Sequence, residues 1–530
     1  ITDAADAMLN LTASSATKDL TVTATSGWDI IAAGQANDTY TLGLGNDSIT
    51  FASGKLSNLD TVSGGEGSDT ITASSAIAIT DVNFINVTSV ENLTLSDTTA
   101  DVTLSTYASA AGISKVTLDT TNANNVVNAA GMTTGVNIVG SVDTNGDDTL
   151  TGGFGDDTFT FSALVGLEDS DRIVGGTGTD KISLDNSAGA MTAGVNTTNG
   201  IVVKDSDAAG TVSGVEQFVV LNANGGDTVG AEDADPVIVN FKDTVSAAAY
   251  NTIVDGSIIT DTNDILTVDA SAVTDVNFYT TFDIRGGAAA DVLKGGDGAD
   301  TITGGGGADA IDAGVGADTL TGGAGADQYT LVLGDSTSAK TDTITDFAAA
   351  SDKLNITVSG NINFDLRDKG DVVDNAAGAA LLSNSSTAGE YFFNTTTNAF
   401  VQDTDGNGLI QSTDTVINLT DETGFDSVDV NWTVSGTQGK TVTTGDGADL
   451  VTLASASSDV VSTGKGNDTI TFTTTNHLTN GDTITGGLGT DTLKIVDTGL
   501  TDGNLTNMTG VEKIVLTGAS SIELGANAVT

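Results

Sequence analysis

The chain contains 530 residues, of which 17 are basic and 71 are acidic, and its formal net charge is -54. Such a polyanion is a poor partner for nucleic acid and for anionic membrane surfaces, whereas divalent cations suit it well. The sequence has no cysteine and a single histidine, His477, so disulfides, thiolate metal sites and histidine-based catalytic triads are excluded. No run of eighteen apolar residues occurs, and we therefore expect no membrane insertion.

A single proline and abundant Thr, Val, Asn, Asp and Gly favour strands and turns over helices. Two strands are expected near the start of the chain, around residues 8–11 and 20–22. From residue 24 the chain follows a period of nine. Residues 24–50 read ATSGWDIIA, AGQANDTYT and LGLGNDSIT, and after a four-residue insert residues 55–72 read KLSNLDTVS and GGEGSDTIT. The run VENLTL at 90–95 closes this first copy.

The same plan returns twice, and a shorter version lies between the copies. Residues 143–221 contain DTNGDDTLT, GGFGDDTFT, GLEDSDRIV and GGTGTDKIS, and they close with VEQFVV. Residues 444–516 contain TGDGADLVT, ASASSDVVS, TGKGNDTIT, HLTNGDTIT and GGLGTDTLK, and they close with VEKIVL. Residues 286–330 consist of five uninterrupted units, GGAAADVLK, GGDGADTIT, GGGGADAID, AGVGADTLT and GGAGADQYT. These nonapeptides follow the pattern G-G-x-G-x-D-x-U-x, in which U is a large apolar residue, and this pattern is typical of a calcium-binding parallel β-roll.

Each place in the nonapeptide has a physical reason. Glycines at places one, two and four permit backbone angles that a side chain would penalise, and they expose carbonyl oxygens. Aspartate at place six supplies a hard oxygen, and calcium takes six to eight oxygen ligands that neighbouring turns can share. The apolar residue at place eight points inward from a short strand, so the coils must stack to bury it. A flexible glycine-rich linker is the alternative, but linkers do not hold aspartate and an aliphatic residue in phase.

The predicted calcium ligands are first of all the nineteen aspartates at place six. They are Asp29, Asp38, Asp47, Asp60, Asp69, Asp148, Asp157, Asp171, Asp180, Asp291, Asp300, Asp309, Asp318, Asp327, Asp449, Asp459, Asp468, Asp482 and Asp491. Asp342, Asp346 and Asp352 follow the central units in a D-x-I-x-D-F…D-x-L segment, and they are further candidates, with a solvated turn as the alternative for each. That segment resembles those that often close β-rolls in secreted calcium-binding proteins.

A second kind of calcium loop is predicted at residues 403–414. This stretch matches D-x-D-x-N-G with an acid at the twelfth place, and its ligands are Asp403, Asp405, Asn407 and Asp414. Both flanks have the composition of strands, so we expect a β-hairpin loop rather than a helix-flanked EF-hand. An empty turn rich in Asp and Asn is the alternative.

The expected fold class is all-β, with calcium-binding parallel β-roll or β-helix solenoid segments interleaved with small β-rich domains. The expected segments are a first roll module (1–95), a connector (96–142), a second module (143–221), a connector (222–285), the central roll (286–360), a β-rich segment with the calcium loop (361–435) and a third module (436–530). Each connector is either a solenoid coil or a small sandwich. Because residues 517–530 resemble residues 96–109, the third module stops partway, and we expect the parent polypeptide to continue.

The nonapeptides resemble the RTX (repeats-in-toxin, hemolysin-type calcium-binding) repeats. With its Thr- and Val-rich connectors and the string at 268–273 that leads into Arg285, the chain looks most like RTX surface-layer proteins of Gram-negative bacteria such as that of Caulobacter. This resemblance implies many bound Ca²⁺ ions, type I secretion, and a chain that folds outside the cell, where calcium is plentiful. It also implies an extracellular location at the cell surface.

We expect a non-enzymatic structural protein that self-assembles on calcium binding into a surface layer, sheath or filament. Its partners would be copies of itself, with cell-surface polysaccharide as a further candidate, and neither nucleic acid nor a membrane interior. The alternatives are the stalk of an RTX adhesin or biofilm-matrix protein and, with less support, a polysaccharide lyase or epimerase. No cluster of Lys, Arg, Tyr and His suited to such an enzyme is visible in the sequence.

Overall fold

The fold was analysed in a computed structural model. It describes residues 8–73, 78–96, 101–118, 124–140, 148–161, 171–185, 201–203, 212–221, 237–241, 251–260, 262–263, 265–273, 281–332, 340–348, 351–358, 364–372, 388–394, 399–402, 415–419, 430–436, 439–444, 447–455, 458–473, 478–496 and 501–517. The chain divides into two compact units, residues 1–264 and 265–530.

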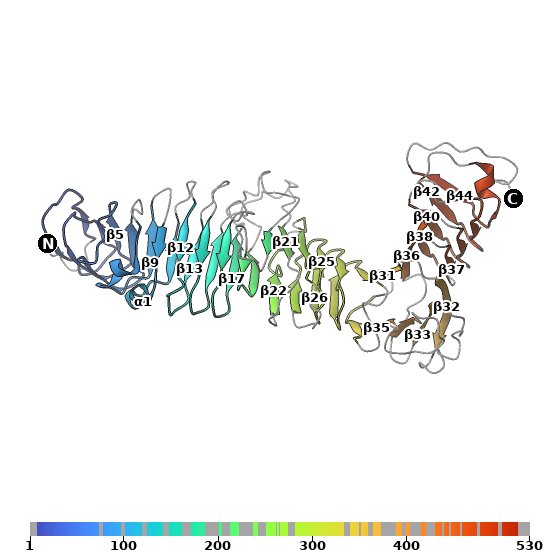
Figure 1. The fold of residues 1–530 in the computed structure, drawn as a ribbon, viewed down its shortest axis with the longest axis horizontal. Coiled ribbons are helices and arrows are strands. Elements are labelled where there is room, and N and C mark those ends of the chain that lie inside the picture. Colours follow the sequence, from blue (N-terminus) through green and yellow to red (C-terminus); the bar gives the residue numbers. More distant parts are fainter. Residues whose placement is uncertain are drawn as a thin grey trace. The chain divides into compact units, whose positions relative to one another are not determined.

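Unit 1 is built from short strands that alternate between two parallel sheets (Figure 1). The first sheet contains, in order of pairing, β1 (Asn10–Thr12), β3 (Ile30–Ala32), β5 (Ser48–Phe51), β7 (Thr70–Ala73), β9 (Asn92–Leu95), β11 (Lys115–Thr117), β13 (Asn137–Val139), β15 (Thr158–Phe161), β17 (Lys181–Asp185), β20 (Gln217–Leu221) and β22 (Asn251–Asp255). Opposite it lie β2 (Thr21–Thr23), β4 (Thr39–Leu44), β6 (Thr61–Glu66) and β8 (Val87–Thr88). Further along the chain, a sheet of its own contains β10 (Asp101–Thr103), β12 (Val126–Asn128), β14 (Thr149–Thr151), β16 (Arg172–Val174) and β19 (Val212–Ser213). A separate parallel pair is formed by β18 (Ile201–Val203) and β21 (Val237–Phe241).

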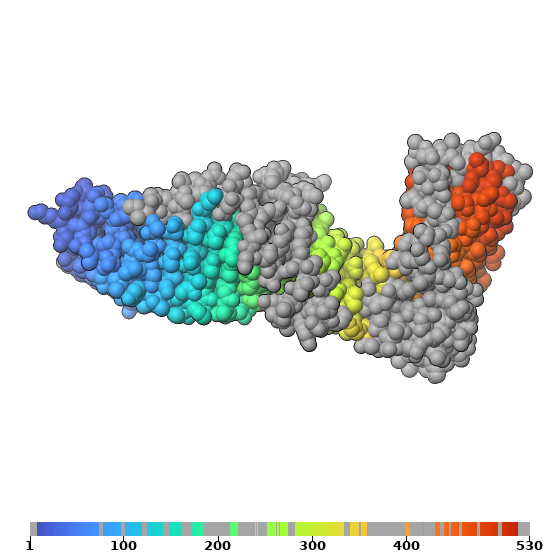
Figure 2. All heavy atoms as spheres, in the orientation of Figure 1, coloured from blue at the N-terminus to red at the C-terminus, as the bar shows by residue number. Residues whose placement is uncertain are grey.

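Successive coils of unit 1 therefore stack in chain order, and the space-filling view shows them as consecutive bands of colour (Figure 2). The residues at place eight of the nonapeptides lie in the core, as predicted: Ile31, Tyr40, Ile49, Val62 and Ile71 are all fully buried in the first module. Stacking in register buries an apolar column that no single coil could bury alone.

The connector at 96–142 is a continuation of the solenoid and not a sandwich. Strand β11 pairs with β9 on one side and with β13 on the other, and β10 pairs with β12, all in parallel. The connector contains a short helix, α1 (Thr106–Ala111), and a 3-10 turn, η1 (Asp81–Phe84), precedes it in the first module. Three backbone N–H groups at the start of α1 donate to the Asp81 carboxylate.

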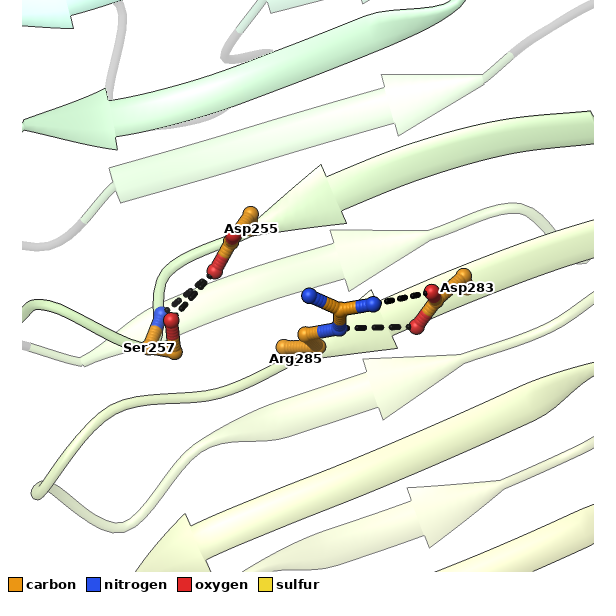
Figure 3. A network of polar contacts seen from close by, with 4 residues as sticks. All are labelled: Asp255, Ser257, Asp283 and Arg285. Atoms are coloured by element: carbon orange, nitrogen blue, oxygen red, sulfur yellow. Dashed lines mark hydrogen bonds and ion pairs between the residues drawn. The ribbon is translucent and has the colours of Figure 1, made fainter.

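Corners without glycine-rich turns are closed by local side chains. At the end of β22 the Asp255 carboxylate accepts hydrogen bonds from the backbone N–H and the hydroxyl of Ser257, at 3.0 and 2.5 Å (Figure 3). In unit 2, Asp269 and Ser271 form the same pair at 3.1 and 2.6 Å. These Asx-type turns need no metal.

Unit 2 follows the same two-sheet plan. One sheet contains β24 (Thr281–Arg285), β26 (Thr301–Gly306), β28 (Thr319–Ala324), β30 (Asp342–Ile344) and β35 (Thr415–Leu419). It also contains β32 (Phe364–Val372), β37 (Thr441–Thr443), β39 (Val460–Ser462), β41 (Thr483–Thr485) and β43 (Met508–Thr509). The other sheet contains β23 (Leu266–Asp269), β25 (Val292–Lys294), β27 (Ala310–Asp312), β29 (Gln328–Val332), β31 (Lys353–Val358), β36 (Val430–Gly436), β38 (Leu450–Ser455), β40 (Thr469–Phe472), β42 (Thr492–Ile495) and β44 (Lys513–Leu516). On the outside of β24, Arg285 binds both carboxylate oxygens of Asp283 (Figure 3).

One part of unit 2 departs from the parallel plan. Strands β33 (Ala388–Asn394) and β34 (Ala399–Gln402) are antiparallel, and so are β34 and β35, with Gln402 opposite Thr415. The expected hairpin across 403–414 is therefore present. The loop itself lies outside the described residues.

The fold class predicted from the sequence is confirmed: the chain is an all-β parallel β-solenoid with nonapeptide repeats. The seven segment boundaries remain a prediction. Among the described residues no helix is long or apolar enough to span a bilayer.

Candidate calcium-binding turns

All nineteen aspartates at place six are buried, and so are Asp342 and Asp352. The nonapeptide corner positions them, because the turn ends at place five and the strand begins at place seven. The carboxylate therefore points back under the coil instead of into solvent. Some nonapeptides depart from the glycine-rich pattern, and their aspartates at place six, such as Asp60 and Asp459, are buried to the same degree.

One carboxylate oxygen of each aspartate is used by the protein itself. In all of them except Asp449, Oδ1 accepts a hydrogen bond from a backbone N–H of the preceding coil, for example from Asp29 N to Asp47 Oδ1 and from Asp47 N to Asp69 Oδ1, both at 2.8 Å. Asp449 uses Oδ2 instead, which accepts a hydrogen bond from the hydroxyl of Thr444. The central roll has the same ladder, with Asp291 N to Asp309 Oδ1 at 2.7 Å and Asp309 N to Asp327 Oδ1 at 2.9 Å. Place six thus joins successive coils even without a metal, a role that the sequence analysis missed.

In all three modules, the ladder that runs through the last place-six aspartate ends on glutamate. Oε2 of Glu91, Glu216 and Glu512 accepts the last N–H, from Asp69, Asp180 and Asp491, at 2.8, 2.7 and 2.8 Å. Each glutamate belongs to the V-E run that closes its module. The threefold repetition of that run was a visible signal in the sequence, but its function as the cap of the ladder was not predicted.

The second carboxylate oxygen is a different case. Within the described part of the chain, Oδ2 of a set of these aspartates is buried and meets no hydrogen-bond donor; the set includes Asp29, Asp47, Asp69, Asp180, Asp309, Asp318, Asp327 and Asp491. Burying an ionised oxygen without a partner is costly, and a cation in contact with it removes that cost. The donor set consists of carboxylate and backbone oxygens and has no thiolate or imidazole, so it fits calcium.

Glycine at place two shapes these turns. In the nonapeptides of Asp69, Asp309 and Asp491 it has a positive φ, +118° at Gly65, +108° at Gly305 and +101° at Gly487. A side chain there would collide with the carbonyl of the corresponding residue one coil earlier. Only glycine permits this conformation at a corner where backbone oxygens of two coils approach each other.

Burial raises the pKa of several of these carboxyl groups. For Asp309 the loss of solvent is the main cause, the neighbouring carboxylates Asp291 and Asp327 add to it, and the pKa is about 7. The same cause gives about 6 for Asp47 and Asp180. Burial followed by the Asp342 carboxylate raises the pKa of Asp318. Without cations, the ionised form of these groups is therefore less favourable in the folded chain than in the unfolded chain.

Carboxylates alone do not form the sites. Among the described residues no three side chains of the types Asp, Glu, His or Cys converge on one point. The aspartates instead lie in rows along the stack of coils. Beside each row, the glycines of one turn lie close to the backbone carbonyls of the turn one coil earlier. A bound ion would be held by aspartate Oδ2 together with backbone carbonyls of adjacent turns, and it would neutralise the charge along the row.

The other predicted ligands divide into three cases. Asp346 is half-buried, and its two oxygens accept the N–H groups of Gly322 and Gly323 at 3.0 and 2.8 Å, so it caps the last turn of the central roll. Asp352 accepts from Asp327 N and Ala348 N. Asp403, Asp405, Asn407 and Asp414 lie outside the described residues, and their role stays a prediction.

Comparison with protein families matches the RTX calcium-binding nonapeptide repeat to residues 21–49, 59–75, 142–163, 164–187, 283–311, 303–337, 453–471 and 480–494. A search of curated proteins found no match. Fold and corners together define a parallel β-roll with buried aspartates in its turns. The chain is a protein with RTX calcium-binding nonapeptide repeats, in which aspartates of the turns bind Ca²⁺. Such repeats are typical of proteins secreted by Gram-negative bacteria.

Proposed function

We propose that this protein is a structural component of the cell surface that folds and self-assembles on binding calcium, as a surface layer, sheath or filament. The observation that carries the proposal is the repetition of one plan in three modules, each a stack of buried aspartates closed by a glutamate cap. Modules of equal design offer equal surfaces, and equal surfaces are what a repeating assembly requires.

Calcium gives this assembly a switch. The chain has a net charge of -54, and self-repulsion at that charge opposes compaction until cations bind. Because the unfolded chain lacks the sites, the free energy of calcium binding stabilises the folded state. The protein would stay extended where calcium is scarce, cross the envelope in that form, and fold outside the cell.

The test follows the purified full-length chain by electron microscopy and circular dichroism, with calcium and after chelation. We expect ordered assemblies and high β-sheet content in calcium, loss of both on chelation, and recovery when calcium but not magnesium is restored. Assemblies that survive chelation unchanged would refute the proposal.

The stalk of an adhesin or biofilm-matrix protein is the second candidate. It is supported by the in-register parallel stacking of coils, since a solenoid in which each coil contacts only its neighbours suits a spacer. A stalk would bind calcium and fold but remain monomeric in the same experiment. Sedimentation velocity in calcium distinguishes the two functions.

A further inference from the structure

The aspartates at place six fall into two classes. In the first, Oδ2 is buried without a donor, as described above. In the second, the protein itself satisfies Oδ2. The clearest example is Asp60, which is fully buried and whose Oδ2 accepts the backbone N–H and the hydroxyl of Ser57, at 2.8 and 2.9 Å. In the third module Asp482 Oδ2 accepts the N–H of Thr479 at 2.5 Å.

These two turns share a local sequence, Leu-Ser-Asn at 56–58 and Leu-Thr-Asn at 478–480, in places two to four of the nonapeptide. Leucine replaces the glycine at place two, and both leucines are buried. The residue at place three, Ser57 or Thr479, donates its N–H to the aspartate. The two turns thus differ from the glycine-rich pattern at places two to four. These are the places at which the glycine-rich turn of Asp69 offers no donor to Oδ2.

The backbone oxygens of the same turns are also occupied. The Asn83 side-chain amide donates to the Leu56 carbonyl at 2.8 Å, and Asn86 donates to Asn58 at 2.9 Å.

The third module repeats the arrangement. Asn504 donates to the Leu478 carbonyl at 2.9 Å and Asn507 to Asn480 at 3.2 Å. These asparagines belong to the T-D-x-N-x-x-N segments at 80–86 and 501–507, each of which ends five residues before a glutamate cap. An amide proton thus stands where a calcium ion would need a free carbonyl oxygen.

A weaker form of the same closure occurs in glycine-rich turns. The N–H groups of Gly153, Gly287 and Gly296 donate to Oδ2 of the aspartate four residues later, at 2.6, 2.7 and 2.9 Å. None of these three glycines has a positive φ, in contrast to Gly65, Gly305 and Gly487. Where place two is glycine, its backbone conformation therefore separates turns whose second carboxylate oxygen faces a protein donor from turns in which that oxygen is left open. Asp29 is open with Thr25 at place two.

We propose that the turns of Asp60 and Asp482 are calcium-free locks, closed by Ser57 or Thr479 and by asparagine amides, and that calcium occupies the turns in which glycine at place two has a positive φ. This inference rests on the calcium binding assigned above and adds which turns take part in it. It makes the penultimate nonapeptide turns of modules one and three independent of calcium. Their neighbouring open turns, those of Asp69 and Asp491, depend on it.

The test compares Asp60→Asn with Asp69→Asn in the full-length chain. Both aspartates are fully buried, belong to the same module and accept a backbone N–H on Oδ1. The number of bound ions is measured by equilibrium dialysis with radioactive calcium, and the thermal midpoint is measured in calcium and in chelator. We expect Asp69→Asn to lose at least one bound ion and to lower the midpoint mainly in calcium. Asp60→Asn should keep the ion count and lower both midpoints equally.

Loss of the same number of ions from both variants would overturn the inference. Asn83→Ala supplies a second measurement outside the nonapeptide: it should leave the ion count unchanged and lower both midpoints, and an altered ion count would contradict the lock. If Asp60→Asn does not fold, the ion count of Asn83→Ala and the pair Asp482→Asn and Asp491→Asn decide the question. A wild-type chain that binds no calcium would instead refute calcium binding itself, so the two failures are distinguishable.

Discussion

Replacing Gly305 by alanine tests whether glycine at place two builds the open turn. Gly305 has φ +108°, and an added β-carbon would overlap the Gly287 carbonyl oxygen of the preceding coil. A left-handed backbone costs a residue with a side chain about 1–2 kcal/mol, and forcing extra volume into a packed site costs about 1–3 kcal/mol. We therefore expect the free energy of unfolding in calcium to fall by about 2–5 kcal/mol. Calcium bound beside Asp309 should be lost as well.

The adjacent Gly306 is the matched control. It lies in the same turn, its φ is not positive, and an added β-carbon would meet nothing closer than 3.7 Å. Gly306→Ala should stay within about 1 kcal/mol of the wild type, because it mainly reduces the entropy of the unfolded chain. Urea unfolding in calcium, followed by circular dichroism, measures both variants. Equal destabilisation by the two substitutions would refute the reasoning, since it would show that any added methyl group disrupts the turn.

Three further outcomes follow from the described contacts. Glu91→Ala leaves the Asp69 N–H without its acceptor and should cost about 1–3 kcal/mol in urea unfolding, whereas Glu91→Gln keeps an acceptor and should cost less; equal losses would argue against the cap. Ser89 has φ +51°, and glycine stands at the equivalent places of the other two modules, Gly214 and Gly510. Ser89→Gly should therefore increase the free energy of unfolding by about 0.5 kcal/mol and raise the thermal midpoint; a lower midpoint would contradict this. Because the pKa of Asp309 is raised from 3.8 to about 7 and that of Asp180 to about 6, the calcium-free fold binds protons more tightly than the unfolded chain and should lose stability as pH rises from about 4 to 7. In calcium the trend should reverse, and thermal midpoints at pH 5 and 7.5, with and without chelator, check both signs; a calcium-free chain that gains stability over this range would be inconsistent with it.

The sequence was sufficient for the fold because the information that specifies it is local. Glycine at place two and an apolar residue at place eight recur within nine residues, and the structure places Ile302 and Leu320 in the core as that period requires. The contacts that occupy the backbone oxygens of a turn are not local. Asp60 and Asp69 occupy the same place in their repeats, yet the amide that occupies the Leu56 carbonyl in the Asp60 turn comes from Asn83, 27 residues away from Leu56. Pattern alone gives no access to such contacts.

The two oxygens of an aspartate at place six therefore have separate roles, and this separation changes how the repeats should be interpreted. Oδ1 joins coils in open turns such as that of Asp69 and also in the closed turn of Asp60, where the Asp38 N–H donates to it at 2.9 Å. An aspartate is thus required at place six for stacking even where no ion binds. Counting aspartates in the motif overestimates the number of calcium ions, because the ion depends on Oδ2 and on the residue at place two. A glycine at place two is therefore an insufficient sequence signal for calcium, because Gly153, Gly287 and Gly296 stand at that place and close Oδ2 with their own N–H groups.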